Sequence, residues 1–355
     1  MTDFGVYVHV PFCRHRCDYC AFATFTDRDH LMTQYVDAVR AEIRRACADG
    51  MPVADTVFFG GGTPTRLAPE LLMSILDEVP RTTGAEVTVE CNPDDVSEEK
   101  FRIFVDRGVN RVSFGVQSMQ KHVLASLGRT HDPDNVKRGV QAALRSGLDD
   151  FNLDVIYGAY GESVADWEST VRSVIELAPP HVSAYGLTVE AGTPLADRPS
   201  EHPDDDRQAE MYEVADDLLS AAGLSNYEVS NWARPGHESR HNRVYWDQGD
   251  YRGFGSAAHS HERGRRWWNV RTPDRYVEAI ASDRDPRSSE EVLDDETRRI
   301  EGLQLALRTR GGVPIDAFDR ADLDLLDGLV EVAEGRAVLT RRGRLMANEV
   351  SLRLR

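Results

Sequence analysis

Short runs of apolar, often β-branched residues alternate with amphipathic stretches along the first two-thirds of the chain. These runs predict six strands, over residues 6–10, 57–59, 87–91, 111–116, 151–157 and 182–189. Their near-continuous apolar character is typical of parallel strands that are covered by helices. The six strand–helix repeats therefore predict an α/β fold with right-handed crossovers, in which the sheet curves into an incomplete (β/α)6 TIM-type barrel.

Helical patterns lie between these strands. Tyr35, Val39 and Ile43 recur every four residues, which places them on one face of a helix. A second helix is expected to begin after Ser97, a good N-cap residue, and a third covers residues 133–146. In such a fold the functional site lies at the carboxyl ends of the strands.

The pattern changes in the last third of the chain. Residues 226–261 are rich in aromatic residues and glycine and show no clear period, and two short apolar runs around Glu334-Gly335 indicate a hairpin. We therefore expect three regions: a barrel domain over residues 1–198, an aromatic-rich extension over residues 199–290, and a small α+β C-terminal domain with a winged-helix-like end over residues 291–355.

Composition and charge exclude several classes of protein. The 355 residues are 41% hydrophobic, enough for a large core, and no apolar run is long enough to span a membrane. The N-terminus has no cleavable apolar segment, so we expect a soluble cytoplasmic protein. The formal net charge of −18 should repel polyanions, and nucleic-acid binding is therefore not expected.

Three of the five cysteines, Cys13, Cys17 and Cys20, lie within eight positions directly after the first strand. This C-x3-C-x2-C spacing lets one loop surround a single metal centre. A [4Fe–4S] cube held by three cysteines leaves one iron free to bind a small molecule. Zinc would need a fourth ligand, for which His9 and His15 are near in sequence. A disulfide is disfavoured because three clustered thiols cannot all pair among themselves.

Polar residues follow other strands at the same predicted edge of the sheet. The turn Gly60-Gly61-Gly62-Thr63 comes after the second strand, and its glycines let backbone groups approach a ligand closely. A charged residue inside an apolar strand is costly unless it has a partner. Glu90 and Asp154 lie in such strands. Either they bind a ligand, or they form structural salt bridges with Arg129 or Lys100.

Together these motifs resemble the HemN/HemW family of radical S-adenosylmethionine (SAM) proteins. The resemblance rests on Tyr-Val-His-Val-Pro-Phe-Cys, Gly-Gly-Gly-Thr-Pro-Thr, Glu-x-Asn-Pro, Gly-Val-Gln-Ser, Gly-Arg-Thr-His and Asp-Val-Ile-Tyr-Gly, and it runs from about residue 7 to the C-terminus. It implies that Cys13, Cys17 and Cys20 bind a [4Fe–4S] cluster. The positions that match SAM contacts in the family are Tyr7, Tyr19, Gly61, Gly62, Thr63, Glu90, Gln117, Arg129 and Asp154.

Three features favour the HemW branch of this family over the HemN branch. Coproporphyrinogen III dehydrogenases of the HemN branch carry a further cysteine two residues after the third cluster cysteine, where this chain has Phe22, and a longer segment before the cluster loop. The string His-Asn-Arg-Val-Tyr-Trp at residues 241–246 resembles the mark of the HemW branch. Its members are regarded as haem chaperones that bind haem and pass it to haem-requiring respiratory proteins.

The resemblance thus implies a haem chaperone with a radical SAM scaffold and no coproporphyrinogen III dehydrogenase activity. The first alternative is an oxygen-independent coproporphyrinogen III oxidase that decarboxylates two propionates by radical SAM chemistry. Two further alternatives are another SAM-dependent enzyme, such as a methylase or cyclopropanase, and a DNA-binding role.

A haem cargo needs an axial ligand and apolar faces. His241 offers an imidazole to iron, and Tyr245 and Trp246 offer aromatic faces to the macrocycle. His259 and His261 are further candidates for the axial ligand, because spacing does not rank the three histidines. The alternative is that Tyr245 and Trp246 pack the extension onto the barrel while His241 and Asn242 cap a turn.

Overall fold

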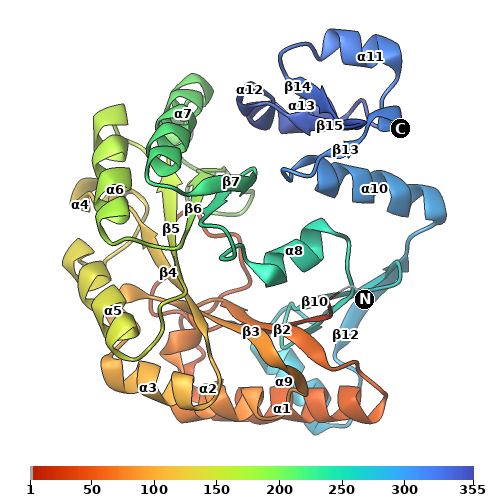
Figure 1. The fold of residues 1–355 in the computed structure, drawn as a ribbon. Coiled ribbons are helices and arrows are strands. Elements are labelled where there is room, and N and C mark those ends of the chain that lie inside the picture. The colour runs from red at the N-terminus through yellow and green to blue at the C-terminus, as the bar shows by residue number, and fades with distance from the viewer. Residues whose placement is uncertain (1–2) are drawn as a thin grey trace.

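The structure is a computed structural model and describes residues 3–355. Its main body is one sheet with the strand order β12-β11-β10-β9-β1-β2-β3-β4-β5-β6-β8-β7 (Figure 1). The first six strands pair in parallel with their neighbours in chain order, which confirms the predicted α/β class. They are Gly5–Val10 (β1), Ala54–Gly61 (β2), Arg81–Cys91 (β3), Arg111–Gln117 (β4), Phe151–Tyr157 (β5) and His181–Gly186 (β6).

Helices follow these strands and cover the outer side of the curved sheet (Figure 1). Tyr35, Val39 and Ile43 are fully buried, so the predicted apolar face of the first helix is confirmed. The Ser97 side chain accepts a hydrogen bond from the backbone of Lys100, as expected of an N-cap. The helices are Met32–Ala48 (α1), Pro69–Leu76 (α2), Glu98–Asp106 (α3), Lys121–Ser126 (α4), Pro133–Arg145 (α5) and Val164–Glu176 (α6), with short 3-10 helices at Asp29–Leu31, Pro64–Arg66 and Pro93–Asp95.

The sixth strand is shorter than its apolar run predicts. β6 ends at Gly186, whereas the run continues to Val189. Beyond the strand, the Leu187 amide donates a hydrogen bond to the Tyr157 carbonyl, and the Leu187 side chain joins a separate small apolar cluster with Val123. The apolar run therefore packs into two different clusters, the main core through β6 and the small cluster through Leu187, and a pattern along the sequence does not distinguish the two.

The residues of the predicted extension lengthen this same sheet at both edges. β8 pairs antiparallel with β6, and β9 pairs parallel with β1, so the two additions lie at opposite ends of the half-barrel. Figure 1 shows α8 on the inner, open side of the sheet, where it contacts β2. The added elements are Asp205–Ala221 (α7), Ser225–Glu228 (β7), Asn231–Ala233 (β8), Arg240–Trp246 (α8), Tyr251–Phe254 (β9), His259–Glu262 (β10), Arg265–Asn269 (β11), Pro273–Ala281 (α9) and Arg287–Val292 (β12), with a 3-10 helix at Pro199–Glu201.

The C-terminal residues form a small α+β unit with its own apolar cluster, which includes Leu307, Val313 and Val350. The expected hairpin is confirmed: Glu334 and Gly335 both have positive φ angles, 52° and 76°, between antiparallel strands. The elements are Asp295–Leu307 (α10), Val313–Pro314 (β13), Ile315–Ala317 (3-10), Arg320–Leu325 (α11), Val330–Ala333 (β14), Arg336–Leu339 (β15), Arg341–Leu345 (α12) and Ala347–Ser351 (α13). The domain boundaries at 198/199 and 290/291 stay a prediction.

Candidate functional site

The loop that carries the three clustered cysteines leaves the sheet at the carboxyl end of β1. Its base is held by backbone hydrogen bonds, from Cys13 to the Phe25 carbonyl at 3.0 Å and from Phe25 to the Pro11 carbonyl at 2.8 Å. Phe12, which is fully buried, anchors the same end in the core. The core and these hydrogen bonds therefore fix both ends of the loop, while its middle remains at the surface.

All three cysteines are unpaired and half-buried, and they line one cavity of about 160 Å³. Within residues 3–355, no three His, Cys, Asp or Glu side chains converge closely enough to hold one metal ion. Seven of the other sequence-predicted site residues line this cavity: Tyr19, Gly61, Gly62, Thr63, Glu90, Arg129 and Asp154. The loop and the carboxyl ends of several strands thus meet at one opening.

The chemistry of the three thiols suits a polynuclear iron site. Burial raises the pKa of Cys13 to about 11 and also raises the pKa of Cys20, so that thiolates here need a positively charged partner. Bound iron supplies such charge, because metal binding displaces the thiol proton. Arg129 adds a fixed cation, since its Nη1 lies 3.6 Å from the Cys17 Sγ.

The glycine turn after β2 is required by close backbone contacts. A Cβ on Gly62 would lie 2.8 Å from the carbonyl oxygens of Val10 and Phe12, both of which belong to backbone and cannot move aside cheaply. Gly61 has a φ of 106°, and a Cβ there would lie 2.4 Å from the His9 ring. The turn therefore packs directly against the start of the cysteine loop and holds it beside the cavity.

Glu90 and Asp154 are both carboxylates within the cavity wall. Burial, and then repulsion from Asp154, raises the pKa of Glu90 to about 8. Glu90 accepts a hydrogen bond from the Gly61 amide at 3.2 Å, and Asp154 accepts one from the Ser113 hydroxyl at 2.7 Å. Two half-buried carboxyl groups near a small opening favour a cationic ligand.

The alternative interpretation of these carboxylates as structural salt bridges is wrong. Within residues 3–355, neither Glu90 nor Asp154 forms an ion pair. Arg129 instead donates through Nη2 to the Gly115 carbonyl at 2.7 Å. Lys100 donates to backbone carbonyl oxygens, including that of Thr65 at 2.7 Å. Both carboxyl groups are thus free of an ion-pair partner within the described residues and available to a ligand.

Tyr7, Gln117 and His241 lie around the edge of this site. Tyr7 and His241 line a second cavity of about 250 Å³, which shares Glu90 and Asp154 with the first. Gln117 has a positive φ of 62°, unusual for a residue with a side chain, and its Nε2 would lie 3.0 Å from a Cβ placed on Gly115. Gln117 therefore lies beside Arg129, on the strand end next to the cysteine cavity.

His241 lies on α8 and makes two hydrogen bonds. Its Nδ1 is 2.8 Å from the Thr56 hydroxyl, its Nε2 is 2.8 Å from the Tyr245 hydroxyl, and the side chain is 1% exposed. The predicted capping role of His241 and Asn242 is wrong: Ser239 is the N-cap of α8, and its side chain accepts a hydrogen bond from the Asn242 amide. Trp246 lines a separate cavity together with Thr309 and its neighbours. α8 thus contacts both the barrel and the C-terminal unit.

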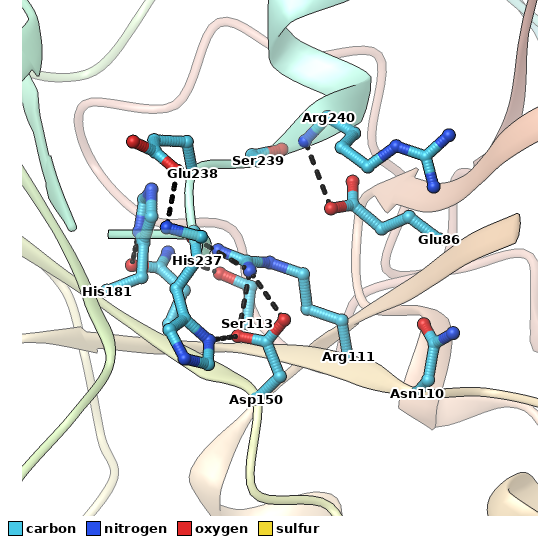
Figure 2. A network of polar contacts seen from close by, with 12 residues as sticks. Glu86, Asn110, Arg111, Ser113, Asp150, His181, His237, Glu238, Ser239 and Arg240 are labelled. Carbon is cyan, nitrogen blue, oxygen red and sulfur yellow. Dashed lines mark hydrogen bonds and ion pairs between the residues drawn. The ribbon is translucent and has the colours of Figure 1, made fainter. Parts of the chain in front are cut away.

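A buried polar network, shown in Figure 2, joins the barrel to the segment that leads into α8. Arg111, at the start of β4, is 2% exposed and donates to both Asp150 carboxylate oxygens, at 2.8 and 2.9 Å, and to the His237 carbonyl at 3.1 Å. His181 connects to Asn152 at 2.7 Å. Sequence reasoning missed this network. Its only local signal was a cation at the first position of an otherwise apolar strand.

Comparison with known proteins gives this geometry a context. A model of the radical SAM superfamily matches residues 7–174. The heme chaperone HemW of Mycobacterium tuberculosis (strain ATCC 25618 / H37Rv) is 42% identical, with 98% of this chain and 93% of that protein covered. The chain belongs to the HemW family of radical SAM proteins.

Other HemW proteins agree with this assignment, and one solved structure shows the fold. The heme chaperone HemW of Bacillus subtilis (strain 168) is 35% identical over 98% of this chain and 97% of its own length, and that of Escherichia coli (strain K12) is 37% identical over 81% and 75%. The structure of coproporphyrinogen III oxidase (HemN) from Escherichia coli, a radical SAM enzyme, superposes with a TM-score of 0.86 at 24% identity, covering 99% of this chain and 89% of that one. It has the same fold.

Membership of the radical SAM superfamily implies a [4Fe–4S] cluster and SAM as cofactors. The residues present fit these cofactors. The three free thiols and the Arg129 guanidinium suit an iron–sulfur cluster, and the half-buried carboxyl groups of Glu90 and Asp154 suit the cationic SAM. Among residues 3–355, no helix has both the length and the apolar character needed to cross a membrane.

Proposed function

We propose that this member of the HemW family is a haem chaperone, which carries haem and passes it to haem-requiring respiratory proteins in the cytoplasm. The observation that carries the proposal is its 42% identity, over nearly its whole length, to a protein named as a heme chaperone. The unpaired state of all five cysteines is consistent with a reducing compartment.

The cofactor site is proposed to be the cysteine cavity. Cys13, Cys17 and Cys20 would hold the cluster, which supplies an iron with an open coordination position and an electron for SAM. Arg129 would then lie beside the cluster and balance part of the thiolate charge. All four residues line the same cavity, the three cysteines from one loop and Arg129 from the segment after α4.

SAM is proposed to occupy the remaining space along the strand ends. The proposed contacts are Tyr7, Tyr19, Gly61, Gly62, Thr63, Glu90, Gln117, Arg129 and Asp154, all of which except Gln117 line the first or the second cavity. Glu90 and Asp154 would face the cationic end of SAM, where an uncompensated carboxylate gains most from a positive charge. Gly61 and Gly62 leave no side chain between the backbone and the ligand.

One observation also bears on the alternative function, an oxygen-independent coproporphyrinogen III oxidase. The HemN structure shares this fold, but the family resemblance places Phe22 where HemN proteins carry a further cysteine, and Phe22 is 67% exposed beside the cavity. Phe22 offers neither a thiol nor a proton to chemistry there. An apolar exposed surface at this position suits contact with a flat apolar cargo.

The function is tested with anaerobically reconstituted protein that is offered haem and coproporphyrinogen III side by side. We expect a shifted Soret band on titration with haem, and no decarboxylation of coproporphyrinogen III in the presence of SAM and reductant. Turnover to protoporphyrinogen would overturn the proposal in favour of the oxidase. Absence of haem binding by protein with an intact cluster would overturn it outright.

SAM binding is expected to release protons at neutral pH. With a pKa of about 8, Glu90 is largely protonated at pH 7 in the free protein. A bound cation favours the carboxylate, so binding lowers this pKa and a proton leaves. SAM affinity should therefore rise as the pH is raised toward about 8.

Calorimetry in buffers of different ionisation enthalpy measures the released protons. Glu90→Gln should remove the release and flatten the pH dependence of affinity. Glu162→Gln is the matched control, because burial also raises the pKa of Glu162 to about 7, but its carboxylate binds the Gly158 amide outside these cavities. Equal proton release by the Glu90→Gln protein would contradict the assignment.

A further inference from the structure

Besides the cysteine cavity and the cavity of Tyr7 and His241, a third cavity, of about 440 Å³, opens beside the cysteine loop. Its walls include Phe22, Tyr7, Tyr245 and Tyr251. Phe22 lines all three of these cavities, so they meet at that side chain. Several aromatic faces around one open hollow favour a flat apolar ligand.

His259 is the histidine of this cavity that is free to bind a ligand. Its side chain is exposed, and within residues 3–355 neither ring nitrogen has a hydrogen-bond partner. The ring stacks on Trp268, its partner across β10 and β11, with centroids 5.5 Å apart and planes 21° apart. Stacking fixes the plane of the imidazole while leaving its nitrogens at the edge accessible.

The other two candidate histidines are already engaged. Both ring nitrogens of His241 are hydrogen-bonded, as described above. His261 is 4% exposed; its Nδ1 lies 2.9 Å from the Gly249 carbonyl, and its Nε2 accepts from the Gly264 amide at 3.2 Å. Either would have to break a buried hydrogen bond before it could bind iron.

Arg271 supplies a cation to the same cavity. The chain has 60 acidic and 42 basic side chains. Within the described part of the chain, most arginines form ion pairs with carboxylates, as Arg28 does with Asp274. Arg271 is exposed and, among the residues from 3 to 355, forms neither an ion pair nor a hydrogen bond through its side chain. An unpaired guanidinium at an aromatic cavity suits the carboxylate of an amphipathic ligand.

We infer that this third cavity is the haem-carrying site, in which His259 is an axial ligand of the iron and Arg271 pairs with a haem propionate. The aromatic side chains would flank the macrocycle, with Phe22 between the cargo and the cluster loop. Burial, and then Arg266, lowers the pKa of His259, which keeps the imidazole in the neutral form that binds iron. This inference rests on the proposed function, because it names the site of the proposed cargo.

Haem titration of the reconstituted full chain tests the inference. In His259→Ala the affinity for haem should fall on the order of tenfold or more, and the Soret band should change position. Added imidazole should restore the original band, because it replaces the missing ligand. His30→Ala, an exposed histidine outside the cavity, is the matched control and should bind as the unaltered chain does.

Arg271→Gln should weaken haem binding without moving the Soret band, whereas the exposed neighbour Arg275→Gln should have no effect. The difference should vanish with haem dimethyl ester, which lacks the propionate charge. If the unaltered chain binds no haem, the proposed function fails. If it binds haem and His259→Ala retains the same affinity and spectrum, only the assignment of this cavity fails, and loss of binding in His241→Ala or His261→Ala would place the ligand elsewhere.

Discussion

Replacing Cys17 with alanine is expected to abolish the iron–sulfur cluster of the reconstituted protein. Cys13, Cys17 and Cys20 line one cavity, and the other cysteine that lines it within residues 3–355 is Cys91. Cys91 cannot replace a lost thiolate, because it is 4% exposed and its thiol donates to the Val89 carbonyl. Bound iron should fall from about four per chain to near zero. SAM binding should be lost with it.

Iron analysis and visible absorption measure this loss, and Cys47→Ala provides the control. Cys47 is a half-buried residue of α1 whose Sγ lies 3.9 Å from the Glu78 carbonyl, outside the described cavities. Its replacement should leave the iron content unchanged. If the Cys17→Ala protein keeps its full complement of iron, the assignment of the cysteine cavity is wrong.

Replacing Asp150 with alanine is expected to destabilise the fold strongly. The Arg111 guanidinium, buried at 2% exposure, would lose both oxygens of its carboxylate partner and keep one hydrogen bond, to the His237 carbonyl (Figure 2). An uncompensated buried charge of this kind typically costs about 3 kcal/mol or more. The free energy of unfolding of the metal-free protein, measured with urea, should fall by about that amount.

Asp149→Ala is the control for this experiment, because Asp149 is the exposed neighbour and makes no side-chain contact among the hydrogen bonds and ion pairs of residues 3–355. Its replacement should change the free energy of unfolding by less than about 0.5 kcal/mol. Replacing Arg111 and Asp150 together with apolar residues should recover part of the loss. If Asp150→Ala changed the free energy of unfolding no more than Asp149→Ala does, Arg111 would not need the Asp150 carboxylate as its partner.

The α/β class and most elements of the half-barrel followed from the sequence. Strands and helices are local, so apolar runs and fourfold spacings were sufficient to predict β1 to β5 and the buried face of α1. The predicted end of β6 was wrong because Leu187 and Val189 pack in a separate apolar cluster and do not continue the strand. The addition of β9 beside β1 was beyond sequence reasoning, since these strands pair across more than 240 positions of the chain.

Part of the candidate site could likewise be predicted from the sequence, and part could not. Cys13, Cys17 and Cys20 act within one loop, so their spacing alone indicated a shared centre, and the motif at Gly61 and Gly62 is equally local. The sequence could not rank His241, His259 and His261 as axial ligands of haem. It depends on which ring nitrogens already have partners, such as the Thr56 hydroxyl, which lies 185 positions from His241 along the chain.

The sequence by itself determined the period of the fold, the loop with its three thiols and the family to which these motifs point, because each is encoded within a few neighbouring residues. Only the tertiary structure decided which charges are paired and which are free. Asp150 engages Arg111, whereas Glu90, Asp154 and Arg271 have no ion-pair partner among the residues that the structure describes. The physical reason is that burial and hydrogen bonding are properties of neighbours in space, and the sheet brings these together from distant parts of the chain.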